Sequence, residues 1–237
     1  FFLAFCSILK TNAQNEAWNI TTTENNEYTG IAIANGRIGM LTSPDPFQIQ
    51  HVVLNNVYDV DPELKVSQIV HGMNFGNLDV FIDGEQITAE NISNWKQNMN
   101  MKEAAFTTSF SFKNKAEISY TIYALRNVPY TGYIDINIEA KKKIDVKVTG
   151  KIETPKEFKK PTHKYEVLKD METTMPILQS VAETPFGKHT VSTSATFIWH
   201  AINSSRENER PELIEKVASD YTNTLTFNKT VTPDQPL

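Results

Sequence analysis

Two pairs of carboxylates stand close together in the sequence and could act on a glycosidic bond. Asp79 precedes Glu85, and Asp135 precedes Glu139. Hydrolysis of such a bond uses two carboxyl groups about 5–10 Å apart on the two sides of a sugar. The chain carries 28 Asp and Glu residues, so a β protein of this composition brings such pairs together by chance. The pairs alone therefore predict no catalytic residue.

The histidines show no metal-binding pattern. No two of them are four residues apart, and none has the spacing of zinc ligands; they are His51, His71, His163, His189 and His200. Asp59 and Asp61 could hold a hard cation together with a backbone oxygen. A loop capped by Pro62 is the simpler explanation of these two carboxylates. The sequence predicts no metal site and no cofactor.

One loop has the composition of a surface that contacts a sugar. Residues 70–77 contain two glycines, two amides, a histidine and an aromatic ring. The candidates for a substrate rim are His71, Asn74, Phe75 and Asn77. The alternative is a plain turn that leads into a strand beginning at Leu78.

The elements that must position these residues are strands. Nine stretches alternate apolar and polar residues, most clearly over residues 117–124, where Ile118, Tyr120 and Ile122 share one parity. Successive side chains of a strand point to opposite faces, so this pattern predicts a sheet with one buried and one exposed face. Short turns between the stretches favour an all-β antiparallel sandwich.

A single region has helical spacing instead. In residues 206–219, Leu213, Ile214 and Val217 follow Pro211, which suits a first helical turn. The sequence predicts one short helix there.

Glycines mark the turns of the predicted sheet. Asn35-Gly36, followed by Gly39, predicts a tight type I′ hairpin, because that turn needs positive φ at both central residues. Asp83-Gly84 predicts a second two-residue hairpin. Gly150 lies inside an alternating run and indicates a bulge or a close approach of another group.

The N-terminal segment resembles the end of a secretory signal peptide. An apolar run over residues 1–9 is followed by polar residues 10–14, and the run is too short to span a bilayer. We expect residues 1–14 to be a signal remnant and residues 15–237 to be the domain. The cysteine of the chain, Cys6, lies in the remnant, so the domain has no disulfide. The expected location is the bacterial periplasm or the extracellular space.

The size and net charge of the chain limit the kinds of partner that it is expected to bind. The 237 residues suffice for one large core. The net charge of −5 comes without a basic stripe, which argues against nucleic acid. The sequence also predicts no membrane span.

Three strings resemble glycoside hydrolase family 65. Its opening turn is similar to Asn35-Gly36-Arg37-Ile38-Gly39, and its next strand ends in an Asn-Gly-Val-Tyr-Asp-like string, similar to residues 55–59. A third string, residues 98–108, resembles the family's Leu-Asp-Met-Lys-Glu-Gly segment. The chain departs from the family at Ala34, Arg37 and Asn56, and Arg37 is also similar to the more distant family 95.

The resemblance implies an N-terminal β-supersandwich of the galactose mutarotase type, whose last strands we expect to be missing at the C-terminus. In the family a separate (α/α)₆ barrel carries the catalytic residues, so none is assigned to this chain. The implied function is a non-catalytic domain of an exported hydrolase or phosphorylase acting on α-glucosides. It would support the barrel, its main partner, and the rim of its pocket. A homodimer and a bound carbohydrate are further partners that the resemblance allows. The alternative is a free-standing carbohydrate-binding or surface-adhesion sandwich.

Overall fold

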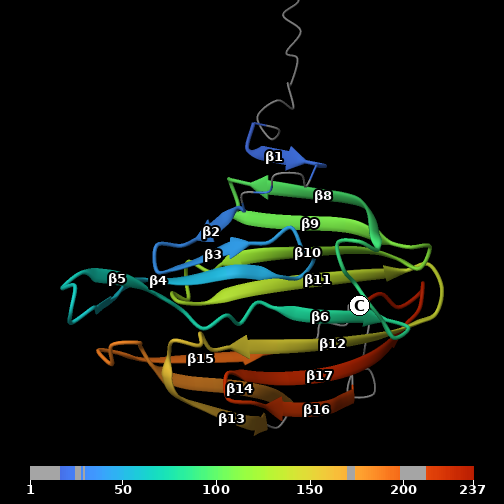
Figure 1. The fold of residues 1–237 in the computed structure, drawn as a ribbon. Coiled ribbons are helices and arrows are strands. Elements are labelled where there is room, and N and C mark those ends of the chain that lie inside the picture. The colour runs from blue at the N-terminus through green and yellow to red at the C-terminus, as the bar shows by residue number, and fades with distance from the viewer. Residues whose placement is uncertain (1–16, 25–27, 29, 170–173, 198–211) are drawn as a thin grey trace, which may run out of the picture.

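The computed structural model describes residues 17–24, 28, 30–169, 174–197 and 212–237. Within these residues the chain forms 17 strands and no helix (Figure 1). The all-β, antiparallel architecture predicted from the alternation is confirmed. The described part also contains no helix long and apolar enough to cross a bilayer. The predicted signal remnant, residues 1–14, lies outside the described residues.

The clearest alternating stretch, residues 117–124, lies in a five-stranded antiparallel sheet. Its order is β1-β8-β9-β10-β11. The strands are β1 (Asn19–Thr22), β8 (Ile92–Asn100), β9 (Ala105–Phe112), β10 (Ala116–Ala124) and β11 (Gly132–Ala140). β10 and β11 pair from Ala116↔Ala140 to Ala124↔Gly132 without a register shift. This continuous register keeps one parity of both strands on the buried face.

A four-stranded sheet packs against the five-stranded one. Its order is β2-β3-β4-β5, with β2 (Ala32–Ala34), β3 (Ile38–Thr42), β4 (Ile49–Val60) and β5 (Ser67–His71). In Figure 1, β2, β3 and β4 overlie β10 and β11, and β2 and β3 contact β10. The two sheets therefore form the two layers of a sandwich.

Two further sheets, formed mostly by strands from the C-terminal half of the sequence, extend the sandwich. One has the order β16-β17-β12-β6-β7 and the other β13-β14-β15. The first comprises β6 (Leu78–Ile82), β7 (Glu85–Gln86), β12 (Ile144–Glu153), β16 (Glu212–Ala218) and β17 (Thr222–Val231). The second comprises β13 (Lys159–Lys169), β14 (Thr174–Glu183) and β15 (Thr190–Thr196). β14 packs against both β12 and β17.

The buried residues form two hydrophobic clusters. The larger one joins the two layers, with Ile118, Tyr120 and Ile122 of β10 each at most 3% exposed. Burial raises the pKa of Tyr120 to about 12. The smaller cluster lies between β12, β14 and β17 and includes Ile152 and Leu178. Phe75 and Phe197 pack against both clusters and so join them.

The turn predictions at Asp83 and Gly150 are confirmed. Asp83 and Gly84 both have positive φ, 51° and 80°, between β6 and β7. Gly150 is a site of close approach without a bulge: a Cβ built there would lie 2.0 Å from Cζ of Phe197. Its pairing with Leu225 and Leu78 is regular.

The type I′ turn at Asn35-Gly36 is wrong, although the hairpin exists. Of the two residues only Gly36 has positive φ, 86°. The Asn35 side chain explains the difference, because its Oδ1 accepts the N–H groups of both Arg37 and Ile38 at 2.9 Å. Gly39 lies within β3 and pairs with Ala34.

The predicted helix is also wrong. Residues 212–218 form strand β16, which pairs with β17; residues 206–211 lie outside the described residues. A register shift between Leu213 and Glu215 breaks the alternation there. A bulge places one extra residue in a strand, so the apolar positions no longer follow a period of two.

Candidate functional site

The loop between β5 and β6 holds three of the four predicted rim residues, and its two amides fix it to other strands. The backbones of Asn74 and Glu153 exchange two hydrogen bonds, 2.9 and 2.7 Å long. The Asn74 side chain donates to the Ile49 carbonyl at 2.6 Å and accepts the Gly76 N–H at 3.0 Å. Asn74 therefore ties the loop to both β12 and β4.

Asn77 makes a second link between the same strands. Its Nδ2 donates to Oε2 of Glu153 at 2.5 Å, and its Oδ1 accepts the Ile49 N–H at 2.7 Å. Both ends of each amide are thus bonded within the chain. A short polar side chain in this position satisfies backbone groups that the loop would otherwise leave unpaired.

Phe75 anchors the loop by packing. Its ring is partly buried between the two hydrophobic clusters. It lies over Gly132 at the start of β11, where an added Cβ would be 2.8 Å from Cε2 and Cζ of Phe75. The absence of a side chain at Gly132 makes room for this ring.

His71 differs from the other three candidates because its ring nitrogens make no hydrogen bond within the described residues. It is the last residue of β5 and is exposed. Its ring centroid lies 5.1 Å from that of His51, which is also exposed on the neighbouring β4. His71 is therefore the rim candidate whose polar atoms can reach a ligand.

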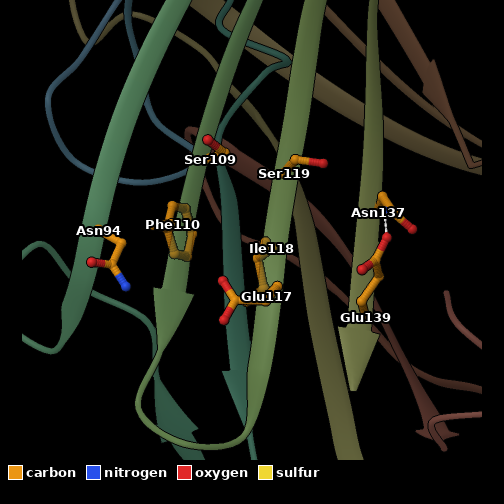
Figure 2. Close-up of a pocket in the computed structure, with 8 residues that line it drawn as sticks. All are labelled: Asn94, Ser109, Phe110, Glu117, Ile118, Ser119, Asn137 and Glu139. Atoms are coloured by element: carbon orange, nitrogen blue, oxygen red, sulfur yellow. Dashed lines mark hydrogen bonds between the residues drawn. The ribbon is translucent and has the colours of Figure 1, made fainter. Parts of the chain in front are cut away.

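The outer face of the five-stranded sheet carries a small open pocket of about 200 Å³ (Figure 2). Pockets for drug-sized ligands are larger, about 300–1,000 Å³, and mostly apolar. This one is lined mainly by polar side chains, and its lining residues are Asn94, Ser109, Phe110, Glu117, Ile118, Ser119, Asn137 and Glu139. Glu117 and Glu139 lie directly opposite each other on β10 and β11.

The electrostatics of this pocket do not suit a general acid. Glu117 pairs with Lys141 at 2.6 Å and accepts a hydrogen bond from Ser111 at 2.6 Å. The hydrogen bond from Lys141, with that from Ser111, lowers the pKa of Glu117. A general acid for glycoside hydrolysis needs a raised pKa, so that it is protonated near neutral pH. The arrangement instead offsets the repulsion between two carboxylates that face each other.

In the first carboxylate pair considered from the sequence, each carboxylate forms an ion pair with a lysine of its own. Asp79 is in an ion pair with Lys151 at 2.6 Å, and Glu85 is in one with Lys113 at 2.5 Å. The Lys113 hydrogen bond lowers the pKa of Glu85. Across the described residues, no cluster of three or more His, Cys, Asp or Glu could hold a metal ion.

Asp59 has a role that sequence reasoning missed. It is 2% exposed, and its Oδ2 accepts the Phe186 N–H of the β14–β15 turn at 2.8 Å. Burial acts to raise its pKa, but the hydrogen bonds from Phe186, Thr184 and Val60 outweigh it and lower the pKa. Asp61 caps its own loop by accepting the N–H groups of residues 63 and 64. Both carboxylates thus accept hydrogen bonds from backbone N–H groups of the chain itself.

The chain is similar in sequence to a known family of proteins. The profile of the glycosyl hydrolase family 65 N-terminal domain matches residues 16–236. The chain belongs to this family. It is 30% identical over 233 residues to a kojibiose hydrolase of Flavobacterium johnsoniae, covering 98% of the chain and 34% of that protein. It is 29% identical over 208 residues to a kojibiose hydrolase of Mucilaginibacter mallensis, covering 88% of the chain and 30% of that protein.

A solved structure supports the fold of this family 65 domain. It comes from the human microbiome and is provisionally named a kojibiose phosphorylase. The TM-score is 0.62 at 10% identity, over 94% of this chain and 31% of the other. The chain therefore spans about a third of the relatives it matches. The resemblance to family 65 drawn from residues 35–39, 55–59 and 98–108 is confirmed.

Proposed function

We propose that this chain is the non-catalytic N-terminal sandwich of an exported family 65 enzyme that acts on α-glucosides. Two facts support the proposal: the family's N-terminal profile matches residues 16–236, and the two kojibiose hydrolases are about three times longer than the matched part. The sandwich would support an (α/α)₆ barrel that carries the catalytic residues. The free-standing binding module is not favoured, because neither curated relative consists of this domain alone.

Two of the carboxylates, Glu85 and Glu117, fit a supporting role. Glu85 and Glu117 have lowered pKa values because lysines donate hydrogen bonds to them. A carboxylate held ionised in this way cannot give a proton to a leaving group near neutral pH. The reaction itself is therefore proposed to depend on residues outside this chain.

The rim function is proposed for the loop between β5 and β6. Asn74 and Asn77 would hold the loop rigid against β4 and β12. Phe75 would fix the position of the loop over the start of β11 by packing on Gly132. His71 would then contact the sugar. Replacing His71 with alanine should raise KM for the substrate more than it lowers kcat, because His71 would bind but not react. His189→Ala, which removes a partly buried histidine on the β14–β15 turn, is the control.

Kojibiose is the first substrate to test, because both curated relatives are named for its hydrolysis. The complete protein should release glucose from kojibiose, and phosphate dependence will separate a phosphorylase from a hydrolase. Residues 15–237 alone should be inert on kojibiose, maltose, trehalose and nigerose. Turnover by this fragment that a point change within it abolishes would contradict the proposal.

Export is proposed from the apolar run of residues 1–9. The mature protein should begin near Asn15 and appear in the periplasmic or culture fraction. N-terminal sequencing of protein purified from the native cells measures this. A cytoplasmic protein that retains residues 1–14 would contradict export without touching the assignment to family 65.

A further inference from the structure

β11 is the last strand of its sheet, and one backbone pair already continues the sheet beyond it. On the open side of β11, the Ile138 N–H donates to the Leu237 carbonyl at 2.7 Å, and the Leu237 N–H donates to the Ile138 carbonyl at 3.2 Å. Two reciprocal bonds within one residue pair are the hydrogen-bonded pair of an antiparallel ladder. The C-terminus indeed lies close beside β11 (Figure 1). Leu237 thus stands where a neighbouring strand would begin.

The rest of this edge is open in the described residues. Alternate residues of an antiparallel strand direct their N–H and C=O groups to the same side. Ile136 and Ile134 therefore point theirs to the side on which Leu237 lies, whereas β10 pairs with the opposite side. Among the described strands none pairs with them there.

Burial changes along β11 at the point where Leu237 ends the contact. Ile138 and Ala140 are 0% and 7% exposed, but Ile136 and Ile134, on the same face, are only partly buried. Natural edge strands are often blocked by lysine, proline or a bulge. β11 contains neither residue and pairs with β10 without a shift. Its edge is therefore able to accept another strand.

We infer that, in the complete protein, the polypeptide following Leu237 adds a sixth strand along β11, antiparallel to it. This inference rests on the proposed function, because it needs the longer polypeptide that the curated relatives have. The second residue after Leu237 lies opposite Ile136, the fourth opposite Ile134 and the sixth opposite Gly132. Leu237 packs on the larger hydrophobic cluster, so these three positions face the same core and carry apolar side chains.

The added strand leads the chain to the candidate rim. Six residues of strand span about 20 Å, and the strand ends beside Gly132, over which Phe75 packs. The part of the enzyme that follows is thereby delivered to the end of the sandwich where residues 72–77 lie. The strand is what brings the rim loop and the catalytic part together.

Amide hydrogen exchange at single-residue resolution on the complete protein tests the strand. Tyr133, Asp135 and Asn137 bond to β10 and serve as controls within β11. If the strand is present, the amides of Ile134 and Ile136 exchange within about tenfold of these controls. Exchange about a hundredfold faster at Ile134 and Ile136 overturns the inference. Protection that disappears on dilution to a monomer also overturns it, in favour of a second copy at this edge.

A cysteine pair gives an independent measurement. Asp135→Cys is combined with a cysteine at the third residue after Leu237, directly opposite in the inferred register. Facing residues of an antiparallel pair lie about 4.5–5.5 Å apart, within reach of a disulfide. Tyr133→Cys with the same partner is the control, and should cross-link much less. Equal cross-linking of the two pairs, or none, overturns the register. Activity on kojibiose with an exposed β11 edge would leave the proposed function standing and this inference refuted.

Discussion

Replacing Gly150 with alanine should destabilise the domain, because the ring of Phe197 occupies the space that a Cβ would need. The added carbon would lie 2.0 Å from Cζ, 2.8 Å from Cε1 and 3.0 Å from Cε2 of Phe197. Ordinary contacts between carbon atoms are about 3.5–4.0 Å long. The ring would therefore have to move by about 1.5 Å.

Phe197 has little freedom to make this movement. It packs edge-on against Phe227, with centroids 5.3 Å apart, and touches both hydrophobic clusters. Overpacking of this kind costs about 1–3 kcal/mol. The lower backbone entropy of alanine in the unfolded chain offsets about 0.5–1 kcal/mol. We expect a net loss of about 1–2 kcal/mol for Gly150→Ala.

Urea unfolding of the protein measures this loss, and exchange of the β12 amides shows that it occurs in this domain. Gly39→Ala is the matched control: its Cβ would meet Ala34 at an ordinary 3.8 Å, so stability should change by less than about 0.5 kcal/mol. In a Phe197→Leu background, Gly150→Ala should cost at least about 1 kcal/mol less. An unchanged stability for Gly150→Ala, or the same loss in both backgrounds, would refute the packing argument.

Four further predictions concern the surface and the hydrogen bonds. Asp59→Ala should speed amide exchange at Phe186 and cost about 2 kcal/mol, with Asp59→Asn less severe; equal exchange in all three proteins would contradict this. The pKa of Asp59 is lowered on folding, so ionised Asp59 stabilises the folded domain above pH about 4. This stabilisation should be lost as the pH falls through the lowered pKa, which an acid titration of the free energy of unfolding measures. Lys141→Met should raise the pKa of Glu117, measurable by NMR, yet change stability by under about 0.5 kcal/mol because both side chains are well exposed. Residues 15–237 alone should self-associate in light scattering, since an open β11 edge and exposed apolar groups are left uncovered; a monodisperse, cooperatively melting monomer would argue for an autonomous domain.

The strands with unbroken register were predictable from the sequence. β10 and β11 pair along their full length, so each residue keeps to one face and the period of two is visible. β16 was not predictable, because its register shift after Leu213 puts apolar residues at a spacing that a helix also produces. Alternation reveals a strand only where pairing is regular.

The sequence predicted that residues 70–77 include a polar loop, but not the contacts that the side chains of the loop make. The composition of residues 70–77 singled out a loop of unusual polarity. The sequence does not show, however, whether an asparagine side chain of that loop binds a sugar or a backbone group. Asn74 and Asn77 are bonded to Ile49 and Glu153, partners 25 and 76 residues away in sequence. The contact of Asp59 with Phe186 joins residues 127 positions apart. No local pattern can report partners at such separations.

Gly132 is where the proposals for the rim and for the added strand meet. Its missing side chain lets Phe75 fix the loop between β5 and β6 over the start of β11. The inferred strand ends opposite the same residue, so the chain would leave the sandwich beside that loop. If the catalytic groups lie in a barrel, as proposed, this domain would contribute the position of one exposed histidine, His71, relative to the barrel that follows the inferred strand. The rigidity of the loop, set by Asn74, Asn77 and Phe75, is what would make that position reproducible.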